Sequence, residues 1–105
     1  MNKQEFTGRI VADPQLRTAG DKQVCSFRMA VRTRGINTPD AFINCEAWGK
    51  MGEAIARYAA KGKPIGVVTH LKQHSYDKDG VKITADDFVV EDVDFLEPKK
   101  NGEEA

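Results

Sequence analysis

The sequence of 105 residues predicts a single all-β domain with one helix, arranged as a five-stranded barrel. Five segments have the alternation or the short apolar runs of strands, and one segment keeps the 3.6-residue period of a helix. Turn-forming residues separate these segments. The predicted order is strand, strand, strand, helix, strand, strand, so the helix falls between strands three and four.

The first predicted strand covers residues 6–11, and Gly8 inside it is typical of a bulge or a tight bend. Asp13 and Pro14 end this strand. Residues 15–18 are expected to be extended, and residues 19–21 to form a turn.

The second strand, residues 24–34, has the clearest alternation in the chain. Its inward side carries Cys25, Phe27, Met29 and Val31. Its outward side carries three arginines, Arg28, Arg32 and Arg34. A guanidinium is a good phosphate partner because its planar fork holds two oxygens. This side therefore predicts contacts with phosphate groups.

The third strand, residues 42–48, places small apolar residues on one side and a polar surface on the other. Phe42 and Trp48 lie at the two ends of that polar surface. Aromatic side chains in this position suit the stacking of a flat ligand better than burial. Strands two and three are expected to pair antiparallel, which puts the arginine row beside these aromatics.

The helix follows the third strand directly. Its apolar stripe consists of Met51, Ile55, Tyr58 and Ala59. Gly62 is expected to stop the helix, and Pro64 prevents its continuation.

Residues 65–76 form the predicted fourth strand, residues 77–80 a hairpin turn, and residues 81–95 the fifth strand. The fourth strand turns Lys72, His74 and Tyr76 outward together. The apolar residues of the fifth strand do not keep one parity. We therefore expect this strand to be bent or interrupted near residues 86–87.

Composition argues against several classes. No apolar run approaches the roughly 18 residues of a transmembrane helix, and the first ten residues lack the apolar core of a signal peptide, so we expect a cytoplasmic protein. Cys25 and Cys45 fall on inward positions and are expected to be buried, reduced thiols. Nothing suggests a metal, a cofactor or a catalytic set of residues, so we expect no enzyme.

The zero net charge hides an asymmetry. Residues 1–85 carry 14 Lys or Arg and 8 Asp or Glu, whereas residues 86–105 carry 2 and 8. A basic body is compatible with a polyanionic partner, although solvated charges alone would also account for these counts.

The predicted order of elements is that of the OB-fold, which binds oligonucleotides or oligosaccharides over strands two and three and the adjacent loops. The outward arginines and aromatics fall on those two strands. Two other hypotheses stay open. The first is an OB-fold adaptor that binds RNA or a protein partner. The second, which is weak, is a metal-assisted nuclease that uses the aspartates at positions 77, 79, 86 and 87, since a hairpin turn and a strand start also explain them.

Five segments carry a resemblance to a known family: GRIVADPQLR, CSFRMAV, DAFINCEAWGKMGEAIARYAAKGKPIGV, LKQHSYDKDGVKI and FVVEDVDFLEPK. In this order they resemble the bacterial single-stranded DNA-binding proteins, including their phage and plasmid relatives. The resemblance covers residues 2–99. It implies an OB-fold binding domain over residues 1–98, a short polar tail over residues 99–105, and nonspecific binding and protection of single-stranded DNA in replication, recombination or repair.

The resemblance also implies that bases stack on Phe42, Trp48 and Tyr76, which match surface aromatics of the family by position. The loop over residues 34–39 lacks the aromatic that the family often carries there, so we expect fewer stacking platforms. The residues expected to contact phosphates are Arg28, Arg32, Arg34, Lys50, Lys63, Lys72, His74, Lys78 and Lys82. The alternative is a place in the core for Trp48, a place in the core or in a subunit interface for Phe42, and a place over the end of the barrel for Tyr76. Four further aromatics, Phe27, Tyr58, Phe88 and Phe95, are assigned to the core.

Members of this family typically form homotetramers by pairing through the first strand, so a tetramer is favoured here and a dimer is the alternative. Residues 3–7 are more polar than the family's usual first strand. Cellular members end in a long tail with an acidic tip that recruits other replication proteins. The last residues, KKNGEEA, have no such tip, which argues against recruitment by that route. A location in the cytoplasm, associated with the nucleoid, is expected.

Overall fold

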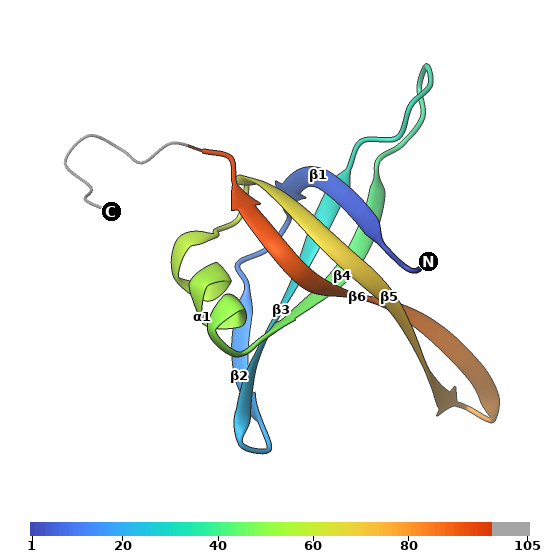
Figure 1. Cartoon of the computed structure of the whole chain (residues 1–105). Helices are drawn as coiled ribbons and strands as arrows, with labels where there is room; N and C mark the ends of the chain where they lie inside the picture. Colours follow the sequence, from blue (N-terminus) through green and yellow to red (C-terminus); the bar gives the residue numbers. More distant parts are fainter. Residues whose placement is uncertain (98–105) are drawn as a thin grey trace.

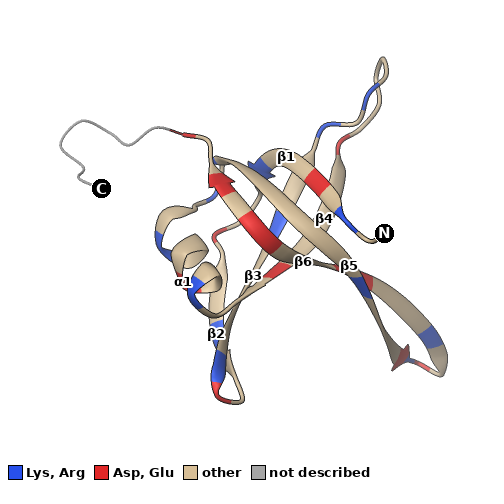
Figure 2. Ribbon diagram, viewed as in Figure 1, with Lys and Arg blue, Asp and Glu red and all other residues tan. Residues whose placement is uncertain are grey.

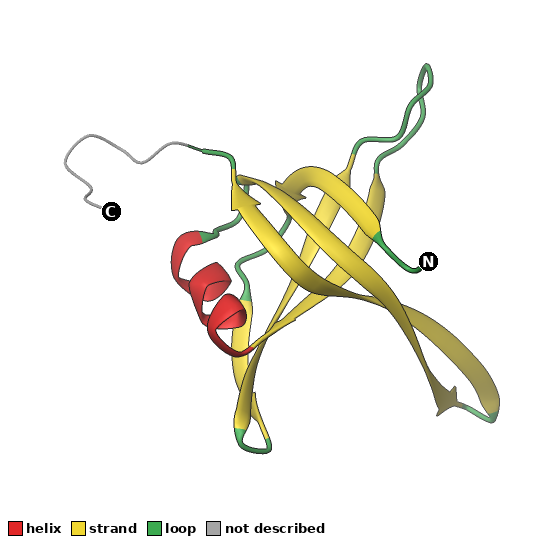
Figure 3. Ribbon diagram, viewed as in Figure 1, coloured by secondary structure: helices red, strands yellow, loops and turns green. Residues whose placement is uncertain are grey.

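The computed structural model describes residues 1–97, so the expected tail at residues 99–105 and the domain end at residue 98 lie outside the described residues. The elements in chain order are β1 (Gln4–Ile10), β2 (Gln15–Ala19), β3 (Lys22–Val31), β4 (Ala41–Trp48), α1 (Gly49–Tyr58), β5 (Pro64–Lys78) and β6 (Val81–Phe95). The predicted fold class is confirmed: strands dominate, and the helix lies between β4 and β5 (Figure 3). The segment expected only to be extended is a strand of its own, β2, because it pairs with β3 from Gln15 to Ala19.

The strands form a closed ring. Their order in the sheet is β1-β5-β6-β4-β3-β2, and β1 also pairs with β3 (Figure 1). At this closure Gly8 lies opposite Val31. A Cβ atom on Gly8 would overlap the carbonyl oxygen of Ala30, so the two strands approach closely where Gly8 has no side chain. Among residues 1–97 no helix is long and apolar enough to cross a bilayer.

The core lies inside this ring, and α1 packs against the ends of β3 and β4. Ile10, Met29, Ile55 and Ile65 are its largest apolar side chains with almost no exposure. Gly52 is also buried, at the point where α1 meets the barrel. The apolar stripe predicted for the helix contained Ile55 and Ala59, which are buried, but it overlooked Gly52.

Cys25 and Cys45 are buried and free, as predicted. Burial raises the pKa of the Cys45 thiol to about 12, and it also raises the pKa of Cys25. Both groups therefore stay protonated near neutral pH. A protonated thiol is a poor nucleophile, because the thiolate is the reactive form.

The bend expected near residues 86–87 is a bulge at Glu91 instead. Val68 pairs with Asp92 and Thr69 pairs with Val90, so Glu91 is the extra residue on β6. One extra residue moves every later side chain to the opposite face. This explains why the apolar residues of β6 change parity between Val90 and Val93.

Two boundary predictions were wrong. Strand β3 ends at Val31, because the first residue of β4, Ala41, pairs with Val31 and the preceding residues form a loop. Arg32 and Arg34 therefore belong to this loop. The helix ends at Tyr58, earlier than expected from Gly62.

The core assignment of two aromatics was also wrong. Tyr58 is 52% exposed and Phe95 is 37% exposed. They are the last residues of α1 and β6, and their rings meet edge to face at the rim of the barrel, 5.8 Å between centroids. Phe27 is buried as predicted, and Phe88 is partly buried against Phe6.

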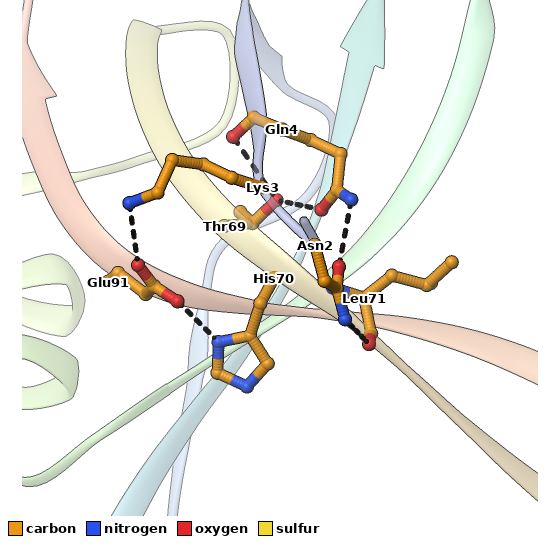
Figure 4. Close-up of polar contacts among 7 residues, drawn as sticks. All are labelled: Asn2, Lys3, Gln4, Thr69, His70, Leu71 and Glu91. Atoms are coloured by element: carbon orange, nitrogen blue, oxygen red, sulfur yellow. Dashed lines mark hydrogen bonds and ion pairs between the residues drawn. The ribbon is translucent and has the colours of Figure 1, made fainter.

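Polar side chains attach the N-terminus to the middle of β5 (Figure 4). The amide of Asn2 accepts a hydrogen bond from the Leu71 backbone N–H and donates one to the Leu71 carbonyl, each at 2.8 Å. Gln4 accepts a hydrogen bond from the Thr69 hydroxyl at 3.0 Å. Asn2 thus pairs with β5 as a further strand residue would.

The bulge residue Glu91 joins the same cluster from β6 (Figure 4). One carboxylate oxygen lies 2.7 Å from Nδ1 of His70, and the other lies 3.2 Å from Nζ of Lys3. These hydrogen bonds, of which the one with His70 has the larger effect, lower the pKa of Glu91 below its ordinary value. The carboxylate form is therefore favoured in the folded state.

This cluster predicts a specific acid sensitivity. Because the pKa of Glu91 is lower in the folded chain, its contribution to stability is present above the ordinary value of 4.5 and is lost as the pH falls through the lower folded value. The free energy of unfolding, measured with urea over a pH series, should fall more steeply below pH 4.5 for the native chain than for Glu91→Gln. The variant Glu5→Gln, which removes an exposed carboxylate of β1, gives the baseline for the loss of one surface charge. Parallel curves for the native chain and Glu91→Gln would contradict this prediction.

Candidate nucleic-acid interface

The outer face of β3 and β4 carries the predicted functional residues. The two strands pair antiparallel, as expected, with Arg28 opposite Asn44, Ala30 opposite Phe42 and Val24 opposite Trp48. Residues that face each other in such a pair project on the same side of the sheet. The arginine and both aromatics of these strands therefore share one outer face.

A groove of about 620 Å³ lies on this face. Five strands contribute to its lining, from β2 through β3, β4 and β6 to β5. The hairpins β2–β3 and β5–β6, which both contribute lining residues, project from the barrel (Figure 1). The predicted residues that line it are Arg28, Trp48, Lys72 and His74.

Trp48 is held at the edge of the groove by a carboxylate. Its indole Nε1–H donates a hydrogen bond to Glu46 at 2.9 Å, and Nζ of Lys72 lies 3.2 Å from the other oxygen of Glu46. The Glu46 side chain is only 15% exposed, whereas Trp48 is 37% exposed. The indole is therefore oriented by its polar edge while part of the ring remains available to a ligand.

Phe42 and Tyr76 are also exposed, at 54% and 47%. The guanidinium of Arg28 lies 5.1 Å from the centroid of the Phe42 ring, a cation–π contact. The Tyr76 ring is stacked against His74, with centroids 5.9 Å apart. None of the three predicted aromatics belongs to the core, so each has ring surface that a base can contact.

His74 contacts a second carboxylate of the groove. Its Nδ1 lies 2.5 Å from Oδ2 of Asp87 on β6. Two of the predicted phosphate contacts, Lys72 and His74, are therefore paired with acidic residues in this structure. Both histidine and lysine side chains are about half exposed, which keeps these pairs open to exchange with other anions.

The other predicted cations take different positions. Lys50 lies beside Trp48, in a shallow depression next to the groove. Lys78 and Lys82 belong to the projecting β5–β6 hairpin, which carries Tyr76, and Arg32 and Arg34 belong to the β3–β4 loop. Figure 2 shows basic residues on both of these projections, with acidic bands on β1 and late β6. Lys63 stands apart from the groove and pairs with Glu97 at 3.7 Å.

Sequence reasoning missed further groove residues, among them Arg17, Glu46 and Asp87. Arg17 on β2 donates a hydrogen bond to Ser26 at 2.9 Å and lines the groove, but β2 was not predicted as a strand. Glu46 was given no role although it was placed on the polar face, and Asp87 was considered only for the weak nuclease alternative. Their parity on the outer face was the available signal for placing them near Trp48 and His74.

The acidic residues do not assemble a metal site in the described part of the chain. Within residues 1–97 no three His, Cys, Asp or Glu side chains come together in a metal-binding arrangement. The groove instead offers ring faces, guanidinium and ammonium groups, and paired carboxylates. Such a surface is suited to stacking and to ion pairing.

Comparisons of the sequence and of the structure with known proteins agree on one family. The profile of the "Single-strand binding protein family" matches residues 1–96. A protein of Clostridium perfringens named single-stranded DNA-binding protein is 37% identical over 97% of this chain and 70% of its own length. Single-stranded DNA-binding protein 3 of Clostridium acetobutylicum is 41% identical over 92% of this chain and 72% of its own. The crystal structure of a small single-stranded DNA-binding protein from Streptomyces coelicolor superposes with a TM-score of 0.77 at 20% identity, covering 90% of this chain and 95% of that one.

Proposed function

Because the chain belongs to the single-strand binding protein family, we propose that it binds single-stranded DNA in the groove between the β2–β3 and β5–β6 hairpins, without sequence preference. One observation carries this proposal. The half-exposed Trp48 ring and the Arg28 guanidinium line the same groove, so a ring face and a phosphate partner are available to one strand.

The bases stack on Trp48, Phe42 and Tyr76. Each base has a π face, and stacking on an aromatic side chain contributes roughly 1–3 kcal/mol per base with little dependence on sequence. A duplex hides these faces within its own stack. The same surface therefore prefers single strands.

The phosphates pair with the cations around the rings. Arg28 lies within the groove and Lys50 lies beside it, whereas Lys78 and Lys82 lie on the β5–β6 hairpin and Arg34 lies on the β3–β4 loop. Lys72 and His74 exchange their carboxylate partners for phosphate when a strand enters. Each phosphate contact releases counterions, so the affinity falls as the salt concentration rises.

The biological role that fits this binding is protection of exposed strands during replication, recombination or repair, in the cytoplasm and associated with the nucleoid. Residues 1–98 are assigned as the binding domain. The groove holds and covers the strand, and no chemical step is assigned to it.

A homo-oligomer is part of the proposal, with a tetramer favoured over a dimer. Strand β1 pairs with β5 over residues 4–9 but with β3 only over residues 8–10. Among the described residues, the second edge of residues 4–7 therefore has no strand partner. Such an edge can pair with a second copy. Light scattering during size-exclusion chromatography tests this, and a monomer mass at every concentration would contradict it.

Fluorescence of Trp48, the one tryptophan of the chain, tests the binding proposal. Titration with oligo-dT should quench this fluorescence to saturation, and the midpoint should move to higher DNA concentration as salt is added. Duplex DNA of the same length should bind much more weakly. Absence of binding at low salt would overturn the proposal and favour an adaptor for RNA or a protein partner.

A further inference from the structure

We propose that Arg9 and Arg32 form a second phosphate subsite, which leads a single strand from Phe42 across β3 onto β1. This inference rests on the proposed function and extends its binding surface beyond the groove. The observation behind it is a lateral row of residues across three strands. Arg9 pairs with Ala30 on β3, and Ala30 pairs with Phe42 on β4.

Residues that face each other across a sheet project on the same side, so Arg9, Ala30 and Phe42 share one outer face. Neighbouring strands lie about 4.8 Å apart, which places the Cα atoms of Arg9 and Phe42 roughly 10 Å from each other. A strand whose base stacks on Phe42 thus has its neighbouring phosphates within reach of the long Arg9 side chain.

A hollow of about 260 Å³ lies along this row. Its lining residues are Thr7, Gly8, Arg9, Ala30, Arg32 and Asp40. The floor is low because Ala30, which lies between Arg9 and Phe42 in the row, has a single methyl group and is only 5% exposed. Two guanidinium groups therefore border a shallow path on which no large side chain stands.

Asp40 does not neutralise this subsite. Its Oδ2 lies 3.7 Å from Nη2 of Arg9, and the two side chains are 37% and 63% exposed. An ion pair this long and this exposed to solvent is weak. A phosphate offers two oxygens to the guanidinium fork, which is a better partner than one distant carboxylate oxygen.

Binding of oligo-dT of two lengths tests the subsite. We use about 5 and about 16 nucleotides, near the two ends of the range that one OB-fold occupies. Arg9→Gln and Arg32→Gln should each weaken binding of the long oligonucleotide roughly threefold to tenfold at low salt. Each should also reduce the slope of log affinity against log salt by about 0.7, the value for one phosphate contact on a single strand. Binding of the short oligonucleotide should not change, because it fills the groove alone.

Two further variants control this experiment. Arg57→Gln removes one positive charge from α1, where it lines neither hollow, and should leave both lengths unaffected. Asp40→Asn removes the ion-pair partner of Arg9 and should tighten binding of the long oligonucleotide. If the Arg9–Asp40 pair were purely structural, Arg9→Gln and Asp40→Asn would both lower the stability of the fold, and Asp40→Asn would not bind the oligonucleotide more tightly.

Two results would overturn the subsite. The first is that the native chain binds well, but Arg9→Gln and Arg32→Gln bind the long oligonucleotide as tightly as Arg57→Gln does. This result would contradict the subsite and leave the groove proposal intact. The other is failure of the native chain to bind either length, which would remove the proposed function and the subsite together.

Discussion

Replacement of Trp48 by alanine should weaken the binding of oligo-dT by about 1–3 kcal/mol, which is roughly fivefold to 150-fold in Kd. The variant removes the ring on which we propose that a base stacks, and it also leaves Glu46 without the hydrogen bond from the indole. Anisotropy of a labelled oligonucleotide measures Kd for this variant, which has no tryptophan fluorescence of its own.

Two variants separate stacking from other effects of this change. Trp48→Phe keeps a ring face but not the indole N–H, and should retain most of the affinity. Tyr58→Ala removes an aromatic that is more exposed than Trp48 but lies at the rim of the barrel, against Phe95. If Trp48→Ala and Tyr58→Ala bound equally well, the strand would not stack on Trp48, and the groove would have to bind DNA through its cations alone.

The residues on the outer face of β3 and β4 could be predicted from the sequence because the rule that decides them relates only neighbouring residues of one strand. Side chains alternate across a strand, so a buried Cys45 requires its neighbours in the chain to project outward. The same rule placed Arg28, Trp48 and Lys72 correctly on the groove side. The hairpin turn after Lys78 was also predictable, because Asp79 and Gly80 both adopt the positive φ that a two-residue turn requires.

Other features depend on contacts that no local pattern contains. Strand β2 consists mostly of exposed residues, and only its pairing with β3 makes it a strand. The bulge at Glu91 is supported by His70 and Lys3, which are distant in the sequence. Tyr58 fits the apolar stripe of a helix, yet it is the last residue of α1, and its side chain is exposed rather than packed against the barrel.

The same limit applies to the site. Glu46 on β4 reaches Lys72 on β5 although β6 lies between the two strands in the sheet. Parity alone places both side chains outward, but it does not show that they meet. The position of Arg9 beside Ala30 likewise requires the closure of the ring between β1 and β3, which joins residues that a linear pattern keeps apart.

Replacement of Gly52 by alanine should destabilise the fold, although helix propensity predicts the opposite. Alanine in a helix is favoured over glycine by up to about 1 kcal/mol. Gly52 is buried, however, where α1 meets the barrel. A Cβ atom there would overlap the carbonyl oxygen of Ala47 and lie 3.2 Å from the backbone nitrogen of Cys25.

Both of these neighbours are backbone atoms in strands, so neither can turn away as a flexible side chain would. The helix must shift instead, which loosens the packing of Ile55 against the core. Overpacking of this kind costs typically about 1–3 kcal/mol, and the free energy of unfolding from urea titration should fall by that order. Glu53→Ala, at the next and exposed position of α1, is the matched control and should be neutral or slightly stabilising. A stabilised Gly52→Ala would mean that α1 has room to move at this contact, and that glycine at position 52 is not required for the helix to close the barrel.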